Sequence, residues 1–243
     1  MKAVIPAAGH GTRFLPVTRA VPKEMLPIGA KPAIQLIVEE ALAAGADEVV
    51  IVISPEKEII RGYFKDDAAA PRIKWAYQLE QKGLGHAVLQ AAPLLEGEKE
   101  PVLVLLGDAL VSGEAPSAKM VEISRANGGA SVVGLERVPP EKVSRYGIVK
   151  LDGDRIVDLV EKPKPEDAPS DLAIAGRYLL DPAVFELLAT QQPGHGGEIQ
   201  LTDSIRRLVA DHAAYGYVYP GRRQDIGTPE GYLKALKSFA GEI

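Results

Sequence analysis

Three short runs of branched aliphatic residues constrain the fold of this chain more than any other feature. They are AVIPAA (residues 3–8), EVVIVIS (48–54) and PVLVLLGD (101–108). Unbroken apolar runs of this length are typical of strands covered on both faces, as in parallel sheets. Because such strands need helices on both sides of the sheet, the runs predict an α/β protein.

The segments between these runs supply the helices. KPAIQLIVEEALAAG (31–45) has apolar residues at helical spacing, with Pro32 near its start. IKWAYQ (73–78) predicts a further strand, and LGHAVLQAAPLL (84–95) predicts a helix that Pro93 ends. Strands and helices thus alternate through the first half, which predicts a doubly wound sheet.

The second half changes to mixed α+β patterns. YGIVKLDGDRIVDLVEKPKP (146–165) has Asp152 and Gly153 between two alternating segments, which predicts a hairpin. The remaining predicted elements are a strand at 172–180, helices at 182–189 and 199–211, a strand at 214–220 and a closing helix at 229–239. We therefore expect an α+β lobe attached to the sheet.

Composition excludes several classes of protein. A length of 243 residues suits one large domain, and 46% hydrophobic with 25% charged residues describes an ordinary globular chain. A net charge of -5 argues against broad nucleic-acid binding. The absence of cysteine excludes disulfides and thiolate metal sites. Met1 to Ala8 lacks a signal-peptide pattern and no apolar run could span a membrane, so we expect a cytoplasmic protein without a membrane partner.

The segment after the first strand, PAAGHGTRFLPVTRAVPKEML, contains a glycine turn and isolated cations. Gly9 and Gly11 do not form a dinucleotide fingerprint, because Phe14 stands where a third glycine is required. The free N–H groups of such a turn can still approach phosphate oxygens, with Arg13 and Lys23 as counter-charges. From these two glycines alone, a plain turn with solvated cations is the alternative.

A wider spacing of residues distinguishes these two interpretations. Nine residues match the pattern GxGTRxxPxTxxxPKxxxP, namely Gly9, Gly11, Thr12, Arg13, Pro16, Thr18, Pro22, Lys23 and Pro27. By this pattern the chain resembles the sugar-nucleotide pyrophosphorylases, a nucleotidyltransferase family. The segments KEMLP, KGLGHA, VEKP, LAIAGRY and GEIQLTD resemble its bacterial UTP:glucose-1-phosphate uridylyltransferase branch. The resemblance runs from Lys2 to about Phe239.

The resemblance implies a Rossmann-like, doubly wound mixed sheet with an inserted α+β sugar-binding lobe. Residues 1–243 would form one nucleotidyltransferase domain. Within it, 1–135 would mainly bind nucleotide and 136–220 would mainly form the sugar-binding lobe, while 221–243 would supply a second metal ligand and the closing helix.

The implied reaction joins UTP and glucose 1-phosphate into UDP-glucose and pyrophosphate. His86 and Ala109 favour uridine, since thymidylyltransferases usually have glutamine and often asparagine at these places. The alternatives are the same chemistry with dTTP or another sugar 1-phosphate, and a catalytically silent nucleotide-sugar sensor. A nicotinamide dehydrogenase is a poorer interpretation because of Phe14. A homo-oligomer, either a dimer or a tetramer, is a further expectation.

A magnesium site is expected from two aspartates. Asp108 follows an apolar run, at the carboxyl end of a central strand, where ligands bind in open α/β sheets. From the residues alone it could equally be a helix cap or a turn residue. The resemblance pairs it with Asp225 of RRQDIGTPE, and Mg²⁺ prefers two such carboxylates together with phosphate and water oxygens.

The resemblance also assigns the other site residues. The catalytic set is Arg13, Lys23 and Lys162; the nucleotide-binding set is Ala8, Gly9, Gly11, Thr12, Gln78 and Gly83; the sugar-binding set is Gly147, Glu161, Ile174, Gly176 and Glu198. Without the resemblance, Lys162 would be a solvated lysine, Gln78 a surface glutamine and Ile174 a core residue. Thr202 is expected only to start a helix.

Overall fold

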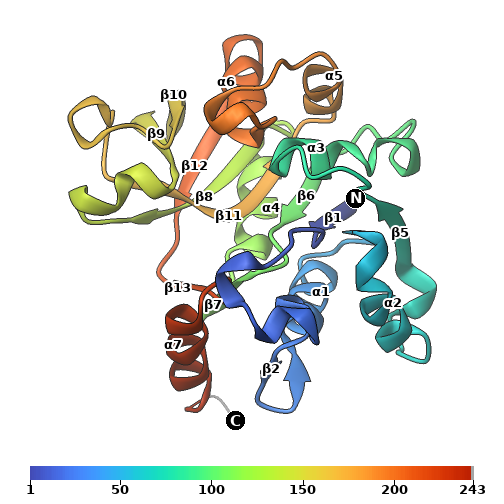
Figure 1. The fold of residues 1–243 in the computed structure, drawn as a ribbon. Helices are drawn as coiled ribbons and strands as arrows, with labels where there is room; N and C mark the ends of the chain where they lie inside the picture. Colours follow the sequence, from blue (N-terminus) through green and yellow to red (C-terminus); the bar gives the residue numbers. More distant parts are fainter. Residues whose placement is uncertain (242–243) are drawn as a thin grey trace.

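The three aliphatic runs form neighbouring strands of one sheet in the structure, a computed structural model that describes residues 1–241 (Figure 1). They are β1 (Lys2–Pro6), β4 (Glu48–Ile53) and β6 (Val102–Leu105), and β1 pairs in parallel with both of the others. A fourth parallel strand, β5 (Ile73–Tyr77), pairs with β4. The chain adds β4 and β5 on one side of β1 and then places β6 on the other side. Open α/β sheets bind ligands at such a switch point, so we expect the ligand crevice between the carboxyl ends of β1 and β6.

The sheet continues beyond β6 with strands of mixed direction. Within residues 1–241 its nine strands lie in the order β5-β4-β1-β6-β11-β8-β12-β10-β9. β11 is antiparallel to β6 and β8, and β12 is parallel to β8. The added strands are β8 (Ser131–Arg137), β9 (Gly147–Asp152), β10 (Arg155–Glu161), β11 (Leu172–Leu180) and β12 (Ala214–Val218). The predicted mixed, doubly wound sheet with an added α+β lobe is confirmed.

Helices cover both faces of the sheet, as the apolar runs require (Figure 1). Ala3 and Ile5 of β1 belong to a core with α1 (Ala33–Ala43), α2 (Glu58–Phe64) and α4 (Ser117–Ala126). Val4, between them, belongs to a second core with α3 (Leu84–Leu89), α5 (Ala183–Ala189) and α6 (Leu201–Asp211). Successive strand residues therefore face opposite layers, and neither face of β1 is solvated.

Most elements lie where the sequence predicts them. β9 and β10 form the expected hairpin, although Asp152 ends β9 and the two connecting residues are Gly153 and Asp154. α7 (Pro229–Phe239) has the predicted bounds. The helix that begins at Leu84 ends at Leu89, ahead of Pro93. Several elements were not anticipated, among them α2, α4, β7 (Ala109–Ser112) and β13 (Arg222–Asp225). They are short or polar, so their periodicity is weak. Two-residue strands β2 (Pro27–Ile28) and β3 (Lys31–Pro32) complete the fold.

The predicted nucleotide-binding and sugar-binding parts of the single domain share one sheet. The boundary between 135 and 136 falls inside β8, and β11 pairs both with β6 of the first half and with β9 of the lobe. Residues 242–243 of the predicted last segment lie outside the described residues. Among the described helices, none is long and apolar enough to cross a membrane.

Candidate active site

Two cavities meet at the carboxyl ends of β1 and β6. The first has a volume of about 420 Å³ and the second about 340 Å³, and both are lined by Leu84, Leu106 and Asp108. All six residues predicted to bind nucleotide line the first cavity: Ala8, Gly9, Gly11, Thr12, Gln78 and Gly83. The second is lined by Arg13, Gly147, Glu161, Lys162, Ile174 and Asp225. Asp108 thus stands where the two cavities join.

The turn after β1 has its shape because of two motif residues. Gly11 has a left-handed backbone, with φ 66°, and its carbonyl accepts a 2.9 Å hydrogen bond from the Thr18 hydroxyl. A Cβ at position 11 would lie 2.9 Å from Thr18 Cγ2, so only glycine suits this place. Phe14 is buried and packs edge-on against the Tyr232 ring, with 5.8 Å between centroids. A third glycine would remove that contact.

Lys23 and Asp108 form a close ion pair at the junction. Lys23 Nζ lies 2.5 Å from Asp108 Oδ2, and the Lys23 side chain is only 10% exposed. Burial works against the charged form of each group. The attraction between them outweighs this penalty, so the pKa of Lys23 lies above its usual value and the pKa of Asp108 below it. Asp108 is therefore held as a carboxylate.

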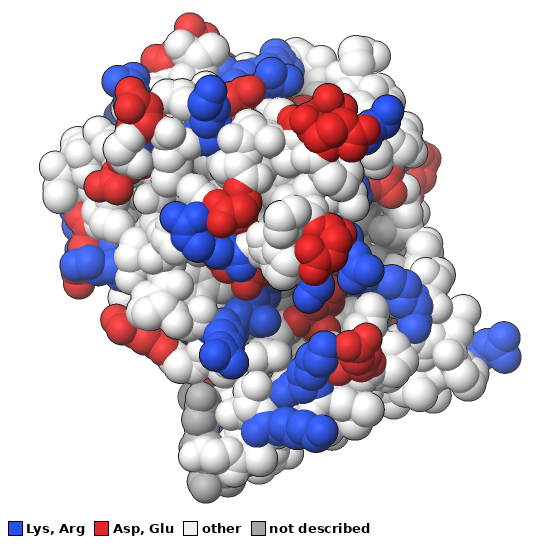
Figure 2. Space-filling model, turned by 90° about the vertical axis from the view of Figure 1, so that its left-hand side faces the viewer, with Lys and Arg blue, Asp and Glu red and all other residues white. Residues whose placement is uncertain are grey.

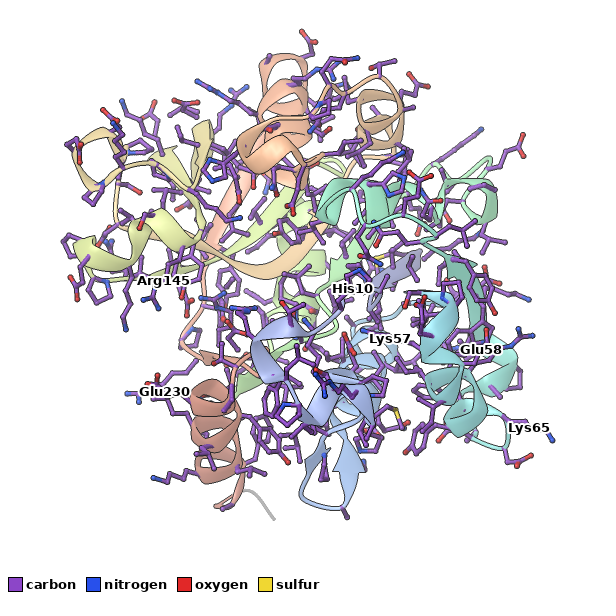
Figure 3. All side chains as sticks on the ribbon, in the orientation of Figure 1. His10, Lys57, Glu58, Lys65, Arg145 and Glu230 are labelled. Carbon is purple, nitrogen blue, oxygen red and sulfur yellow. The ribbon has the colours of Figure 1, made fainter. Side chains whose placement is uncertain are left out.

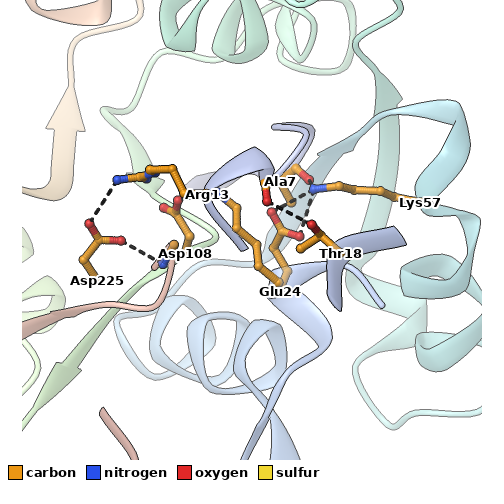
Figure 4. Close-up of polar contacts among 10 residues, drawn as sticks. Ala7, Arg13, Thr18, Glu24, Lys57, Asp108 and Asp225 are labelled. Atoms are coloured by element: carbon orange, nitrogen blue, oxygen red, sulfur yellow. Dashed lines mark hydrogen bonds and ion pairs between the residues drawn. The ribbon is translucent and has the colours of Figure 1, made fainter. Parts of the chain in front are cut away.

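Asp225 lies beside Asp108. A Cβ built at Gly227 would be 2.9 Å from Asp225 Oδ1, 3.3 Å from Asp108 Oδ2 and 2.8 Å from an Arg13 guanidinium nitrogen. Both carboxylates therefore reach within 3.3 Å of a single point, which any side chain at position 227 would fill. Arg13 Nη1 lies 3.8 Å from Asp225 Oδ2, and the Gly227 N–H donates to Asp225 Oδ1 (Figure 4).

These two carboxylates fit the chemistry of a Mg²⁺ site. Hard, ionised oxygens that converge on one small space are what the ion prefers. Over residues 1–241, no group of three or more Asp, Glu, His or Cys side chains could hold a metal. Asp108 and Asp225 would therefore need further oxygens from phosphate and water.

The far end of the first cavity is built around Gln78. Its side chain is buried, not on the surface, and its amide nitrogen donates to the Gly83 carbonyl at 3.2 Å and contacts His86 Nδ1 at 3.0 Å. Gly83 has φ 102°, and a Cβ there would lie 2.8 Å from the Ile199 carbonyl oxygen. Glycine therefore lets the start of α3 pack closely against the segment before α6, while Gln78 holds the cavity wall.

Glu161 and Lys162 lie in the second cavity. Glu161 Oε2 accepts a 2.6 Å hydrogen bond from the Thr202 hydroxyl, and Glu161 Oε1 lies 3.5 Å from Lys162 Nζ. Lys162 has a left-handed backbone, with φ 45°, a conformation that non-glycine residues rarely adopt. Strained residues of this kind cluster at functional sites. A Cβ at Gly147 would lie 2.8 Å from Thr202 Oγ1 and 3.2 Å from Glu161 Oε2, so glycine keeps the wall open.

The comparisons with known proteins agree with this geometry. The pattern that defines the family described as Nucleotidyl transferase matches residues 2–241. The chain belongs to the nucleotidyl transferase family. It is 43% identical to a UTP–glucose-1-phosphate uridylyltransferase of Staphylococcus haemolyticus, over 98% of this chain and 92% of that protein.

Solved structures support the same family. An apo UDP-glucose pyrophosphorylase matches this nucleotidyl transferase with a TM-score of 0.90 and 37% identity, covering 99% of this chain and 98% of that one. A UDP-glucose pyrophosphorylase complexed with UDP-glucose matches with a TM-score of 0.87 and 39% identity, covering 100% and 99%. The resemblance inferred from the sequence motifs is confirmed.

Three predicted residues of this nucleotidyl transferase lie in unexpected surroundings. Glu198, predicted to contact sugar, lines the first cavity and not the second. Ile174 is buried in β11, as its core interpretation requires, yet it also lines the second cavity. Gly176 lines neither cavity: with φ 75° it sits in a bulge of β11, and a Cβ would lie 3.1 Å from Leu106 Cδ1.

Several cavity residues of the nucleotidyl transferase were missed from the sequence. Gln81 lines the first cavity and donates to the Ala8 carbonyl at 3.1 Å. Arg145, Tyr146 and Arg223 line the second, where the Arg223 guanidinium lies 4.3 Å from the centroid of the Tyr146 ring. Their positions beside motif residues in QKGLG, RYG and RRQD are the signal that could have found them.

The cations of the site do not belong to a basic surface. Figure 2 shows Lys and Arg side chains interspersed with Asp and Glu over the face that it draws. Arg145 and Glu230, which Figure 3 labels, lie on the same side of the molecule, Arg145 on the lobe and Glu230 at the start of α7. The positive charges that line the cavities are thus a local cluster on a chain whose net charge is -5.

Proposed function

We propose that this nucleotidyl transferase forms UDP-glucose and pyrophosphate from UTP and glucose 1-phosphate. The observation that carries the proposal is the junction of the two cavities at Asp108, beside Lys23, Arg13 and Asp225. Relatives of this chain are named for that activity, and one related structure contains UDP-glucose, in which nucleotide and sugar are joined. Two adjoining cavities provide one place for each half.

UTP occupies the first cavity in this proposal. The backbone of Ala8 and Gly9 and the wall formed by Gln78 and Gly83 contact the base, while Gly11 and Thr12 face the phosphates. The sugar occupies the second cavity, where Glu161 accepts hydrogen bonds from its hydroxyl groups and Lys162 holds its phosphate. Gly147 and Ile174, which line this cavity, stay assigned to the sugar as predictions. The sugar contacts predicted for Gly176 and Glu198 stay untested, since neither residue lines the second cavity.

The reaction is a displacement at phosphorus. A phosphate oxygen of glucose 1-phosphate attacks the α-phosphorus of UTP, a new P–O bond forms, and the bond to the bridging oxygen breaks as pyrophosphate leaves. The main difficulty is to bring two polyanions together. Arg13, Lys23 and Lys162 reduce this repulsion and orient the reacting groups, which supplies both positioning and electrostatic stabilisation.

Mg²⁺ is the proposed cofactor, and Asp108 and Asp225 would hold it. When bound, it would neutralise the charge of the phosphate oxygens. The two carboxylates are paired with Lys23 and Arg13, so both cations lie next to the place where phosphate would enter.

A matrix of substrates tests the proposal. Pyrophosphate release is measured with each nucleoside triphosphate against a panel of hexose 1-phosphates, with and without Mg²⁺. We expect UTP with glucose 1-phosphate and Mg²⁺ to be fastest. A preference for dTTP would indicate a thymidylyltransferase. Nucleotide-sugar binding without any pyrophosphate release would indicate the catalytically silent sensor. The cytoplasmic location and the dimer or tetramer remain predictions, to be tested by fractionation and light scattering.

A further inference from the structure

Lys57 is a buried lysine outside the predicted site residues. It follows β4, at the start of α2, and its side chain is 8% exposed. Its ammonium group donates to the Ala7 carbonyl at 2.7 Å and to Glu24 Oε1 and Oε2 at 2.9 and 2.8 Å. The Glu24 side chain is 1% exposed. The three donors of Lys57 therefore face three acceptors, out of contact with water.

The acceptors lie on two segments that line the first cavity, and Figure 4 shows Lys57 in contact with both of them. Ala7 immediately precedes Ala8 and Gly9, which line that cavity. Glu24 immediately follows Lys23, which contacts Asp108 at 2.5 Å. One ammonium group thus joins the turn after β1 to the 3₁₀ turn Lys23–Met25, and both to the segment after β4.

The placement of the pair also indicates how it acts. Glu24 lines the first cavity, whereas Lys57 lies behind it and does not line it. Lys57 therefore acts on a ligand only through the groups that it holds. A buried ion pair is weak evidence for stability, since apolar replacements of similar volume are often neutral.

We propose that the Lys57–Glu24 pair is a positioning element for a nucleoside triphosphate. The pair fixes the position of the Ala8 and Gly9 backbone relative to the Lys23 ammonium. The base and the phosphates are then bound at the correct separation. The inference rests on the proposed function only in that UTP occupies the first cavity.

The test separates positioning from stability. The double variant Lys57→Met/Glu24→Leu removes both charges and leaves neither unpaired. We expect it to melt within a few degrees of the wild type. The Kd for Mg·UTP, measured by calorimetry, should rise about 10- to 100-fold, because even a small displacement of positioning groups is costly. The KM for glucose 1-phosphate should change little. If the double variant does not fold, Glu24→Gln, which keeps the shape of the side chain, should shift the same Kd in the same direction.

Glu40→Gln is the matched control. Glu40 is a carboxylate whose side chain is 10% exposed; it is paired with the buried Arg177 at 2.8 Å, on α1 and outside both cavities. It should lower the melting temperature without changing the Kd for UTP. A folded double variant with wild-type Kd and KM values, or one that weakens both substrates equally, would overturn the inference alone. A wild-type protein that does not bind UTP would overturn the proposed function and this inference together.

Discussion

Asp225 lies opposite Ala109 in the antiparallel ladder between β7 and β13, which brings its carboxylate beside that of Asp108. The backbone reinforces this arrangement, because the N–H of Ile226 donates to the Asp108 carbonyl at 3.0 Å. Main-chain hydrogen bonds thus join the segments that carry two acidic residues far apart in the sequence. Their separation does not depend on flexible side chains alone.

The first prediction concerns these carboxylates. Asp108→Asn or Asp225→Asn should lower kcat about 100-fold or more, as removal of one electrostatic stabiliser does at other active sites. Steady-state pyrophosphate release over a Mg²⁺ titration measures the effect, and Mn²⁺ binding followed by electron paramagnetic resonance reports the metal site directly. Asp66→Asn, on the exposed surface, is the control. Full activity in either site variant would refute the metal assignment.

The second prediction concerns Lys162. Removal of its ammonium in Lys162→Ala should raise the KM for glucose 1-phosphate about 10- to 100-fold, since a hydrogen bond to a charged group is worth about 1.5 to 3 kcal/mol. The KM for UTP should change far less, because Lys162 lines only the second cavity. Lys164→Ala, two residues along and exposed, is the matched control. Unchanged kinetics for the sugar phosphate would remove Lys162 from the site.

The third prediction uses a glycine. In Gly147→Ala the new methyl group would lie 2.8 Å from Thr202 Oγ1, so the hydrogen bond between Thr202 and Glu161 must shift. We expect a higher KM for glucose 1-phosphate, measured by initial rates. Gly62→Ala is the control: it lies within α2 with nothing near its Cβ, and alanine there should stabilise the fold by about 0.5 to 1 kcal/mol. Equal kinetics in the two variants would contradict the prediction.

The fourth prediction concerns stability and pH. Burial opposes the ionisation of Glu40, but Arg177 outweighs it and lowers the pKa of Glu40 below the usual 4.5. A lowered folded-state pKa means that the stabilisation is present above pH 4.5 and is lost as the pH falls through the folded value. Glu40→Gln leaves Arg177 buried without its charge partner, which should cost about 3 to 5 kcal/mol at pH 7.

Thermal or urea unfolding between pH 7 and pH 3 checks this prediction. The difference in the free energy of unfolding between wild type and Glu40→Gln should be largest at neutral pH and should shrink as Glu40 is protonated. A difference that is independent of pH would show that lost packing, not lost charge, explains the effect.

Many of the residues predicted for the site line the same two cavities because the signals that mark them are local. The turn after β1 depends on Gly11 and Thr18, which are near neighbours along the chain. All six predicted nucleotide-binding residues line one cavity for a related reason: they follow strands β1 and β5, and the carboxyl ends of parallel strands share one edge of the sheet.

Other residues could not be placed in this way. Glu198 was assigned to the sugar, but the packing of α6 against α3 puts it in the first cavity. Gln78 would be a surface glutamine from its neighbours alone, yet Gly83 and His86 enclose it. Lys57 has no local pattern that marks it, because its partners Ala7 and Glu24 come from two other segments.

The sequence alone therefore specified most of the strands and helices and the turn after β1, since apolar periodicity and turn chemistry depend on near neighbours. The spacing of its motif residues also indicated the family. Tertiary structure decided which side chains share a cavity, which carboxylates converge and which charges are buried together. Those outcomes follow from strand order, register and helix packing, and the distances that they set are not encoded in the spacing of residues along the chain.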